Sequence, residues 1–164
     1  MDSTNSSSTI SISVLLLRVL TFIFLLIALI FIAINRVTDD YTGDKLESKD
    51  VYAYRYMIST IVIGFAYNLL QLAFSIFTVV SGKRVLRSDG GYLFDFFGDK
   101  IISYFLISGS TAGLSLNVEL RRELPSNTFF HKANVSASLL LVGFLFTATA
   151  SIFTSFALPK KTNN

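Results

Sequence analysis

The sequence predicts an all-α integral membrane protein, an antiparallel bundle of four transmembrane helices. The chain of 164 residues is 52% hydrophobic and contains 16 Phe, and its charged residues are nearly confined to the segments between four apolar stretches. Each stretch is long enough, at about 1.5 Å per residue, to cross a hydrocarbon layer of about 30 Å. A soluble helical bundle would need a polar stripe along every helix, and the first stretch has almost none.

The four predicted spans follow one another with short connections. They cover residues 12–34, 55–80, 96–118 and 135–158. Residues 1–11 are rich in Ser, Thr and Asn and predict a disordered tail, and residues 159–164 form a second tail. The first span is too long for a cleavable signal peptide and no small-residue cleavage site follows it, so we expect it to be retained.

The connecting segments give little information on orientation. An even number of spans places both termini on the same side of the membrane. The basic residues of the termini and the second loop nearly balance those of the first and third loops, so the positive-inside rule comes close to a draw. The group Lys83, Arg84 and Arg87 directly after the second span favours cytosolic termini.

Composition excludes several classes of chemistry. The chain has no cysteine and one histidine, His131, which we expect to be a solvated loop residue. Disulfides, thiolate metal sites and cysteine nucleophiles are therefore excluded, and no phosphate-binding loop or hydrolase motif is present. We expect no catalytic residue, metal site or cofactor. We also expect no nucleic acid or small-molecule partner, since small basic groups beside span ends are typical of headgroup contacts.

Arg18 and Asp99 lie inside the first and third spans. A charge in the hydrocarbon is costly unless it is paired, reaches the interface or faces water. Spans one and three run in the same direction, so the two residues lie at similar depth. We therefore predict a buried ion pair that holds these spans together. The alternatives are that Arg18 extends to headgroups while Asp99 pairs with Lys100, or that the charges belong to a proton relay.

Other polar residues of the spans predict contacts between helices. Asn68 and Gln71 share a face of span two and are expected to hydrogen-bond to neighbouring helices rather than to a solute. Tyr52, Tyr54 and Tyr56 predict an interfacial aromatic belt at the start of that span. Within the belt, Arg55 is placed to form a weak pair with Glu119.

Small residues follow one face of each of the last two spans. Span three contains the GxxxG pair Gly109 and Gly113. Span four has small residues at every fourth position, namely Gly143, Thr147, Ser151 and Ser155. Small residues let helix backbones approach closely in lipid. These faces could pack inside the bundle or against another copy, and the sequence leaves both alternatives open.

Three segments stand out when they are taken together. They are Leu15-Leu16-Leu17-Arg18-Val19-Leu20 in the first span, the residues from Gly98 to Leu106 with the small-residue run after them in the third, and residues 49–57, with the sequence KDVYAYRYM, before the second. These segments resemble the plant CASP-like family, which includes the Casparian strip membrane domain proteins and is distantly related to the MARVEL four-span group. The first is similar to the arginine-containing first span of that family, and the second to its third span, where Asp99 stands at the family's aspartate. The segment KDVYAYRYM looks like the entry to span two in the 4D-type branch.

This resemblance implies a MARVEL-like four-helix fold, plasma-membrane residence and both termini in the cytosol. It also implies partners: membrane lipids, and homo- or hetero-oligomers with related CASP-like proteins. We expect a non-enzymatic membrane scaffold, linked through the founding members to local cell-wall modification. The alternative is a channel or carrier subunit. It requires a continuous wet path along five polar residues, Arg18, Asn68, Gln71, Asp99 and Asn117.

Overall fold

Four long helices form the bulk of the structure, a computed structural model that describes residues 2–38, 45–47, 51–81, 89–122 and 127–156. The helices are α1 (Asp2–Ala33), α2 (Tyr52–Ser81), α3 (Asp89–Leu120) and α4 (Asn127–Phe156). Each contains a stretch that is long and apolar enough to cross a membrane: Thr9–Ala33, Tyr52–Ser81, Phe94–Glu119 and Thr128–Ser155. The predicted fold class is confirmed.

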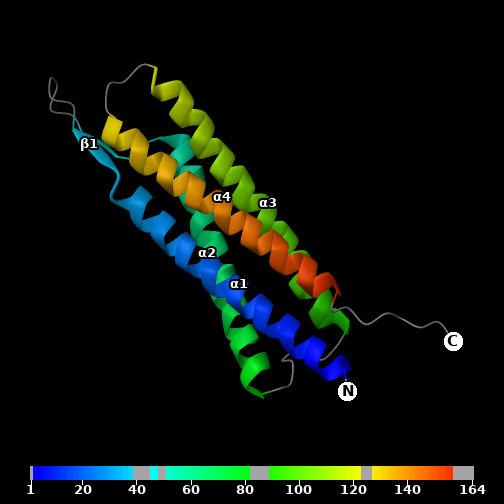
Figure 1. Ribbon diagram of the computed structural model, residues 1–164. Coiled ribbons are helices and arrows are strands. Elements are labelled where there is room, and N and C mark those ends of the chain that lie inside the picture. Colours follow the sequence, from blue (N-terminus) through cyan, green and yellow to red (C-terminus); the bar gives the residue numbers. More distant parts are fainter. Residues whose placement is uncertain (1, 39–44, 48–50, 82–88, 123–126, 157–164) are drawn as a thin grey trace.

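Successive helices run antiparallel, so the beginning of α1 and the end of α4 lie at the same end of the bundle (Figure 1). Each helix packs against two neighbours. The contacting pairs are α1 with α2, α2 with α3, α3 with α4, and α4 with α1. It follows that α1 and α3 lie diagonally across the bundle, with α2 and α4 on either side of the diagonal.

The first connecting segment contains a short antiparallel ribbon at the end of the bundle opposite the start of α1 (Figure 1). Its strands are β1 (Arg36–Thr38) and β2 (Lys45–Glu47), and Val37 pairs with Leu46 at the centre of the register. The sequence predicted no strand in this segment. The sequence does not reveal these strands, because strands of this length leave almost no alternating pattern of apolar and polar residues.

All four helices begin earlier than predicted, α2 by only three residues, at Tyr52 instead of residue 55. α1 begins at Asp2, so residues 2–11 are helical where we expected a disordered tail. Adding a residue to an existing helix gains one hydrogen bond, and Ser13 Oγ bonds to the Thr9 carbonyl oxygen (2.9 Å), so polar residues can extend an apolar helix. α3 begins at Asp89, and α4 at Asn127. The basic group Lys83, Arg84 and Arg87 and the tail 159–164 lie outside the described residues.

The earlier start of α4 changes the setting of the third loop. His131 is exposed as predicted, but it belongs to a helix and not to a loop. Its neighbours Phe129 and Phe130 are each only 2% exposed and belong to the core. An apolar pair of this kind in a segment that reads as a connection was the signal that the helix extends over it.

Candidate functional site

Arg18 on α1 and Asp99 on α3 are in direct contact across the diagonal of the bundle. The Arg18 guanidinium donates two hydrogen bonds to the Asp99 carboxylate, from Nη1 to Oδ1 (3.3 Å) and from Nη2 to Oδ2 (3.1 Å). The Arg18 residue is 4% exposed and Asp99 is fully buried. The arrangement is bidentate, the strongest geometry for this type of pair. The alternative in which Arg18 extends to headgroups and Asp99 pairs with Lys100 does not match this geometry, because Lys100 lies over the Phe96 ring, 5.4 Å from its centroid.

Three further side chains extend this pair along α2 and α3. The Tyr67 hydroxyl donates to Asp99 Oδ1 (2.9 Å). Gln71 Nε2 donates to the Tyr67 hydroxyl (2.8 Å) and to Asp95 Oδ1 (3.1 Å). We call Arg18, Tyr67, Gln71, Asp95 and Asp99 the charged cluster. It joins α1, α2 and α3, and it leads from the buried ion pair to Asp95, which is half-buried one turn earlier on α3.

Asn68 adds a link from α2 to the backbone of α1. Its Nδ2 donates to the carbonyl oxygen of Arg18 (3.0 Å), so the residue that carries the buried cation is held at both its backbone and its side chain. The sequence predicted that Asn68 and Gln71 would bond to neighbouring helices. The structure places both residues in such contacts, 5% and 1% exposed.

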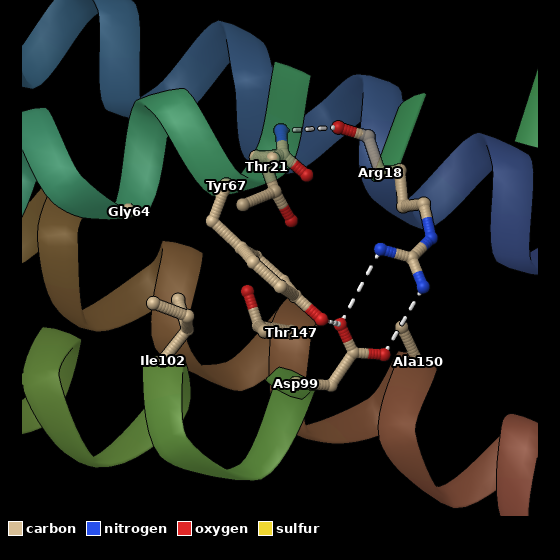
Figure 2. A pocket seen from close by; sticks show the side chains of 9 residues that line it. Arg18, Thr21, Gly64, Tyr67, Asp99, Ile102, Thr147 and Ala150 are labelled. Carbon is tan, nitrogen blue, oxygen red and sulfur yellow. Dashed lines mark hydrogen bonds and ion pairs between the residues drawn. The ribbon is translucent and has the colours of Figure 1, made fainter. Parts of the chain in front are cut away.

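A small pocket lies beside the charged cluster (Figure 2). It is lined by nine residues from all four helices: Arg18, Thr21, Gly64, Tyr67, Asn68, Asp99, Ile102, Thr147 and Ala150. Its volume of about 10 Å³ is close to the minimum that one water molecule needs. A solute larger than water therefore finds no room beside the ion pair in the single chain.

A second polar group lies nearer the other end of the bundle. The Tyr54 hydroxyl donates to Asn117 Oδ1, and Asn117 Nδ2 donates to Asn134 Oδ1 (2.6 Å) and to the Phe130 carbonyl oxygen (3.3 Å). We call Tyr54, Asn117 and Asn134 the asparagine cluster; it joins α2, α3 and α4. Tyr54 is fully buried, so our assignment of this residue to an interfacial belt was wrong, whereas Tyr52 is 85% exposed.

An apolar layer separates the two polar clusters. Leu25, Ile61, Leu106 and Leu140, one from each helix, are fully buried between them. The five residues proposed to line a path thus fall into two groups: four belong to the charged cluster or its Asn68 link, and Asn117 belongs to the asparagine cluster. A continuous polar path through the described part of the single chain is absent, and this removes the geometric basis of the channel alternative there.

The GxxxG pair of α3 packs inside the bundle. A Cβ atom added at Gly109 would overlap Thr60 of α2, and one added at Gly113 would overlap the Met57 sulfur of the same helix. Both glycines are buried. The close approach of α2 and α3 therefore requires glycine at these positions. Of the two alternatives left by the sequence, the structure uses this face for internal packing.

The small-residue face of α4 is also mostly internal. A Cβ atom at Gly143 would lie 3.4 Å from Leu25 of α1. Thr147 and Ser151 are 7% and 2% exposed, and Ser155 alone is exposed. These faces are therefore occupied by the helices of the same chain. Apart from Ser155, they leave no exposed surface for the predicted contact with another copy.

Several contacts were missing from the sequence interpretation. Tyr67 and Asp95 were not identified, although Tyr67 is adjacent to Asn68 and one turn before Gln71. Asp95 was assigned to the second loop because we placed the start of the third span one residue too late to include it. The expected pair of Arg55 and Glu119 is absent among the described residues; the Arg55 guanidinium lies 5.8 Å from the centroid of the Tyr52 ring.

The described helices offer no group of three His, Cys, Asp or Glu residues that could hold a metal ion. Asn134, the first residue of an Asn-Val-Ser acceptor sequence for glycosylation, lies within α4 and is bonded to Asn117. Ser136 of the same triplet donates to the Ala28 carbonyl oxygen of α1 (2.7 Å). Both polar side chains of this triplet thus serve packing between helices.

Comparisons with known proteins agree with this architecture. The family profile of the Casparian strip membrane protein domain matches residues 7–146. CASP-like protein 4D1 of Glycine max is 74% identical over 161 residues, which cover 98% of this chain and 95% of the relative. CASP-like protein 4D1 of Ricinus communis is 47% identical over 90% of this chain and 91% of its own length. CASP-like protein 4D2 of Arabidopsis thaliana is 43% identical over 90% of each chain. No solved structure matches.

Proposed function

Because this chain belongs to the Casparian strip membrane protein family, we propose that it is a non-enzymatic scaffold that self-associates and organises a subdomain of the plant plasma membrane. Its partners in this role are further copies, related CASP-like proteins and the surrounding lipids. The membrane subdomain would be the place where enzymes of local cell-wall modification gather.

One observation supports this proposal above the others: the buried ion pair and the asparagine cluster are satisfied by hydrogen bonds within the bundle. Arg18 and Asp99 pair across the diagonal, and the asparagine cluster closes the opposite part of the core. No cavity larger than about one water molecule lies beside the ion pair. A protein built in this way has its outer helix faces available for interactions, as a scaffold requires.

We also propose that the termini face the cytosol and that the protein resides in the plasma membrane. The family membership and the basic group Lys83, Arg84 and Arg87 after α2 support this orientation. The test is an epitope tag at each terminus in intact plant cells. We expect antibody to label both tags only after permeabilisation, in the layer marked by a plasma-membrane lipid dye. Labelling of intact cells would contradict the orientation, and retention in internal membranes would contradict the location.

Self-association is tested by measuring stoichiometry without detergent. The full chain is extracted with its lipids into polymer-bounded nanodiscs, and the mass of single particles is recorded. We expect dimers or larger assemblies. Particles that hold one copy at every protein-to-lipid ratio would overturn the scaffold proposal. Assemblies that enclose a central water-filled pore would instead support the channel alternative.

A further inference from the structure

The outward faces of α1 and α3 share a spacing but differ in chemistry. On α1 one row of exposed residues along the apolar part of the helix consists of Ile12, Leu16, Val19, Ile23, Leu26 and Ile30. On α3 one row of exposed residues consists of Phe97, Ile101, Tyr104, Ser108, Thr111, Ser115 and Val118. Both rows advance by alternating steps of four and three residues, the spacing of a seam between two supercoiled helices. The row on α1 has the chemistry expected next to lipid, and the middle of the row on α3 does not.

We call Tyr104, Ser108, Thr111 and Ser115 the hydroxyl face. Tyr104 is 66% exposed, and the other three side chains are exposed as well. The mean hydropathy of the α3 span is 1.3, against 3.0 for α1. Ser108 and Thr111 lie within about 7 Å of the middle of the Phe94–Glu119 span, at 1.5 Å per residue. Tyr104, Ser108 and Thr111 are therefore at the depth where lipid is driest, and Ser115 lies about 13 Å from the middle of the span, nearer the interface.

Only some of the hydroxyl groups of this face have a hydrogen-bond partner within the chain. Thr111 Oγ1 donates to the Ile107 carbonyl oxygen (2.8 Å), and Ser108 Oγ lies 2.9 Å from the Tyr56 hydroxyl. Within the part of the chain that the structure describes, the hydroxyls of Tyr104 and Ser115 make no hydrogen bond. Lipid tails offer no partner, so an unpaired hydroxyl at this depth is unfavourable. Cover by another protein surface removes this penalty.

We propose that the hydroxyl face of α3 is the contact between two copies of this chain, with α3 meeting α3 around a two-fold axis along the membrane normal. This inference rests on the self-association proposed above and assigns it a surface. In such a pair each residue meets its own counterpart at the same depth. Because a hydroxyl both donates and accepts, the face is complementary to itself, and its small side chains allow close backbone approach.

Identical copies fit this surface better than a partner of other chemistry does. Any unrelated helix would need hydroxyl or amide groups at the same depth and spacing, whereas a second copy has them by symmetry. The internal stripes of small residues cannot serve, since Gly109 and Gly113 are buried against α2. The apolar row on α1 provides the matched reference, since it has the same spacing and exposure but no polar group.

Single cysteines test this contact directly, because the natural chain contains none. A disulfide forms only where two Cα atoms approach within about 7 Å. We compare Thr111→Cys on α3 with Ile23→Cys, 44% exposed near the middle of the α1 span, in the full chain in native membranes under mild oxidation. We expect a cross-linked dimer from Thr111→Cys and little from Ile23→Cys. Equal or stronger cross-linking of Ile23→Cys would overturn the proposed interface.

In a second measurement the protein is diluted with lipid, and the fraction of dimer is followed without cross-linking. The double variant Thr111→Val and Ser115→Ala keeps the size of the face but removes two hydroxyls, and we expect self-association about threefold weaker for each lost hydroxyl pair. The control Ile23→Val should leave it unchanged. Unchanged self-association of the double variant would show that copies meet through another face. A natural chain that stays monomeric would remove the self-association itself, so the two failures are distinguishable.

Discussion

Arg18 and Asp99 form a bidentate ion pair although the helices that carry them are not neighbours. The guanidinium and the carboxylate meet on the diagonal between α1 and α3, at 3.1 and 3.3 Å. The pair therefore crosses the interior and fixes the depth of α1 relative to α3, in contrast to a pair between adjacent helices. Tyr67 donates a third hydrogen bond to the carboxylate from α2.

Removing one member of this pair should destabilise the bundle more than removing both. Arg18→Met or Asp99→Leu leaves an unpaired buried charge, with an expected loss of about 3–5 kcal/mol in the free energy of unfolding. The double variant leaves no unpaired charge and should therefore recover part of the lost free energy of unfolding. The measurement is unfolding by a denaturing detergent in mixed micelles. A double variant at least as unstable as the worse single variant would show that the pair is not the main interaction of either residue.

The exchange Arg18→Asp with Asp99→Arg separates direct pairing from other roles of these residues. If the two side chains interact chiefly with each other, the exchange should recover stability that both single reversals lose. Recovery would be incomplete, since Tyr67 and Gln71 are arranged for a carboxylate on α3. No recovery over the single reversals would argue against a direct pair.

The Tyr67 hydroxyl should contribute measurably to the charged cluster. Tyr67→Phe removes the donor to Asp99 and the acceptor for Gln71, so we expect a loss of about 1–3 kcal/mol in the free energy of unfolding. Tyr52→Phe is the matched control, because Tyr52 is 85% exposed and should tolerate the change. Equal losses in the two variants would mean that the bonds to Tyr67 add nothing to stability.

The glycines of α3 and α4 should differ in their tolerance of alanine. At Gly109 the added Cβ overlaps Thr60, including its Cβ atom (2.9 Å), which cannot move without the backbone of α2. We expect Gly109→Ala to lower the free energy of unfolding by about 1–3 kcal/mol. At Gly143 the nearest atom would be 3.4 Å away, and the higher helix propensity of alanine offsets the contact. Thermal aggregation in detergent compares the variants, and a stable Gly109→Ala protein would contradict the packing.

The asparagine cluster allows a similar comparison. Asn117→Leu leaves the hydroxyl of Tyr54 and the amide of Asn134 without their partner, and we expect a loss of about 1–3 kcal/mol in the free energy of unfolding. Adding Tyr54→Phe removes one of the unpaired groups and should restore part of the loss. The measurement is again unfolding in mixed micelles. If the second change lowered stability further by its full single effect, the two residues would be energetically independent.

Much of the architecture could be predicted from hydropathy and from the depth of a few polar residues. Four helices, their antiparallel order and the pairing of Arg18 with Asp99 follow from span lengths and from the cost of an unpaired charge in lipid. The bounds could not be predicted as well: the first turns of α3 and α4 contain polar residues, and apolar content alone does not mark where such a helix begins. The ribbon of β1 and β2 was missed because strands of 3 residues leave almost no alternating pattern in the sequence.

The sequence by itself determined that the chain has four stretches able to cross the membrane, and it predicted that Arg18 and Asp99 pair, because hydrocarbon gives a buried charge no other partner. Only the tertiary structure decided which face of each helix points inward. The rotation of a helix about its axis depends on packing against its neighbours. For this reason Gly109 and Gly113 face α2, Tyr54 is buried against Asn117, and the hydroxyl face of α3 lies on the outside.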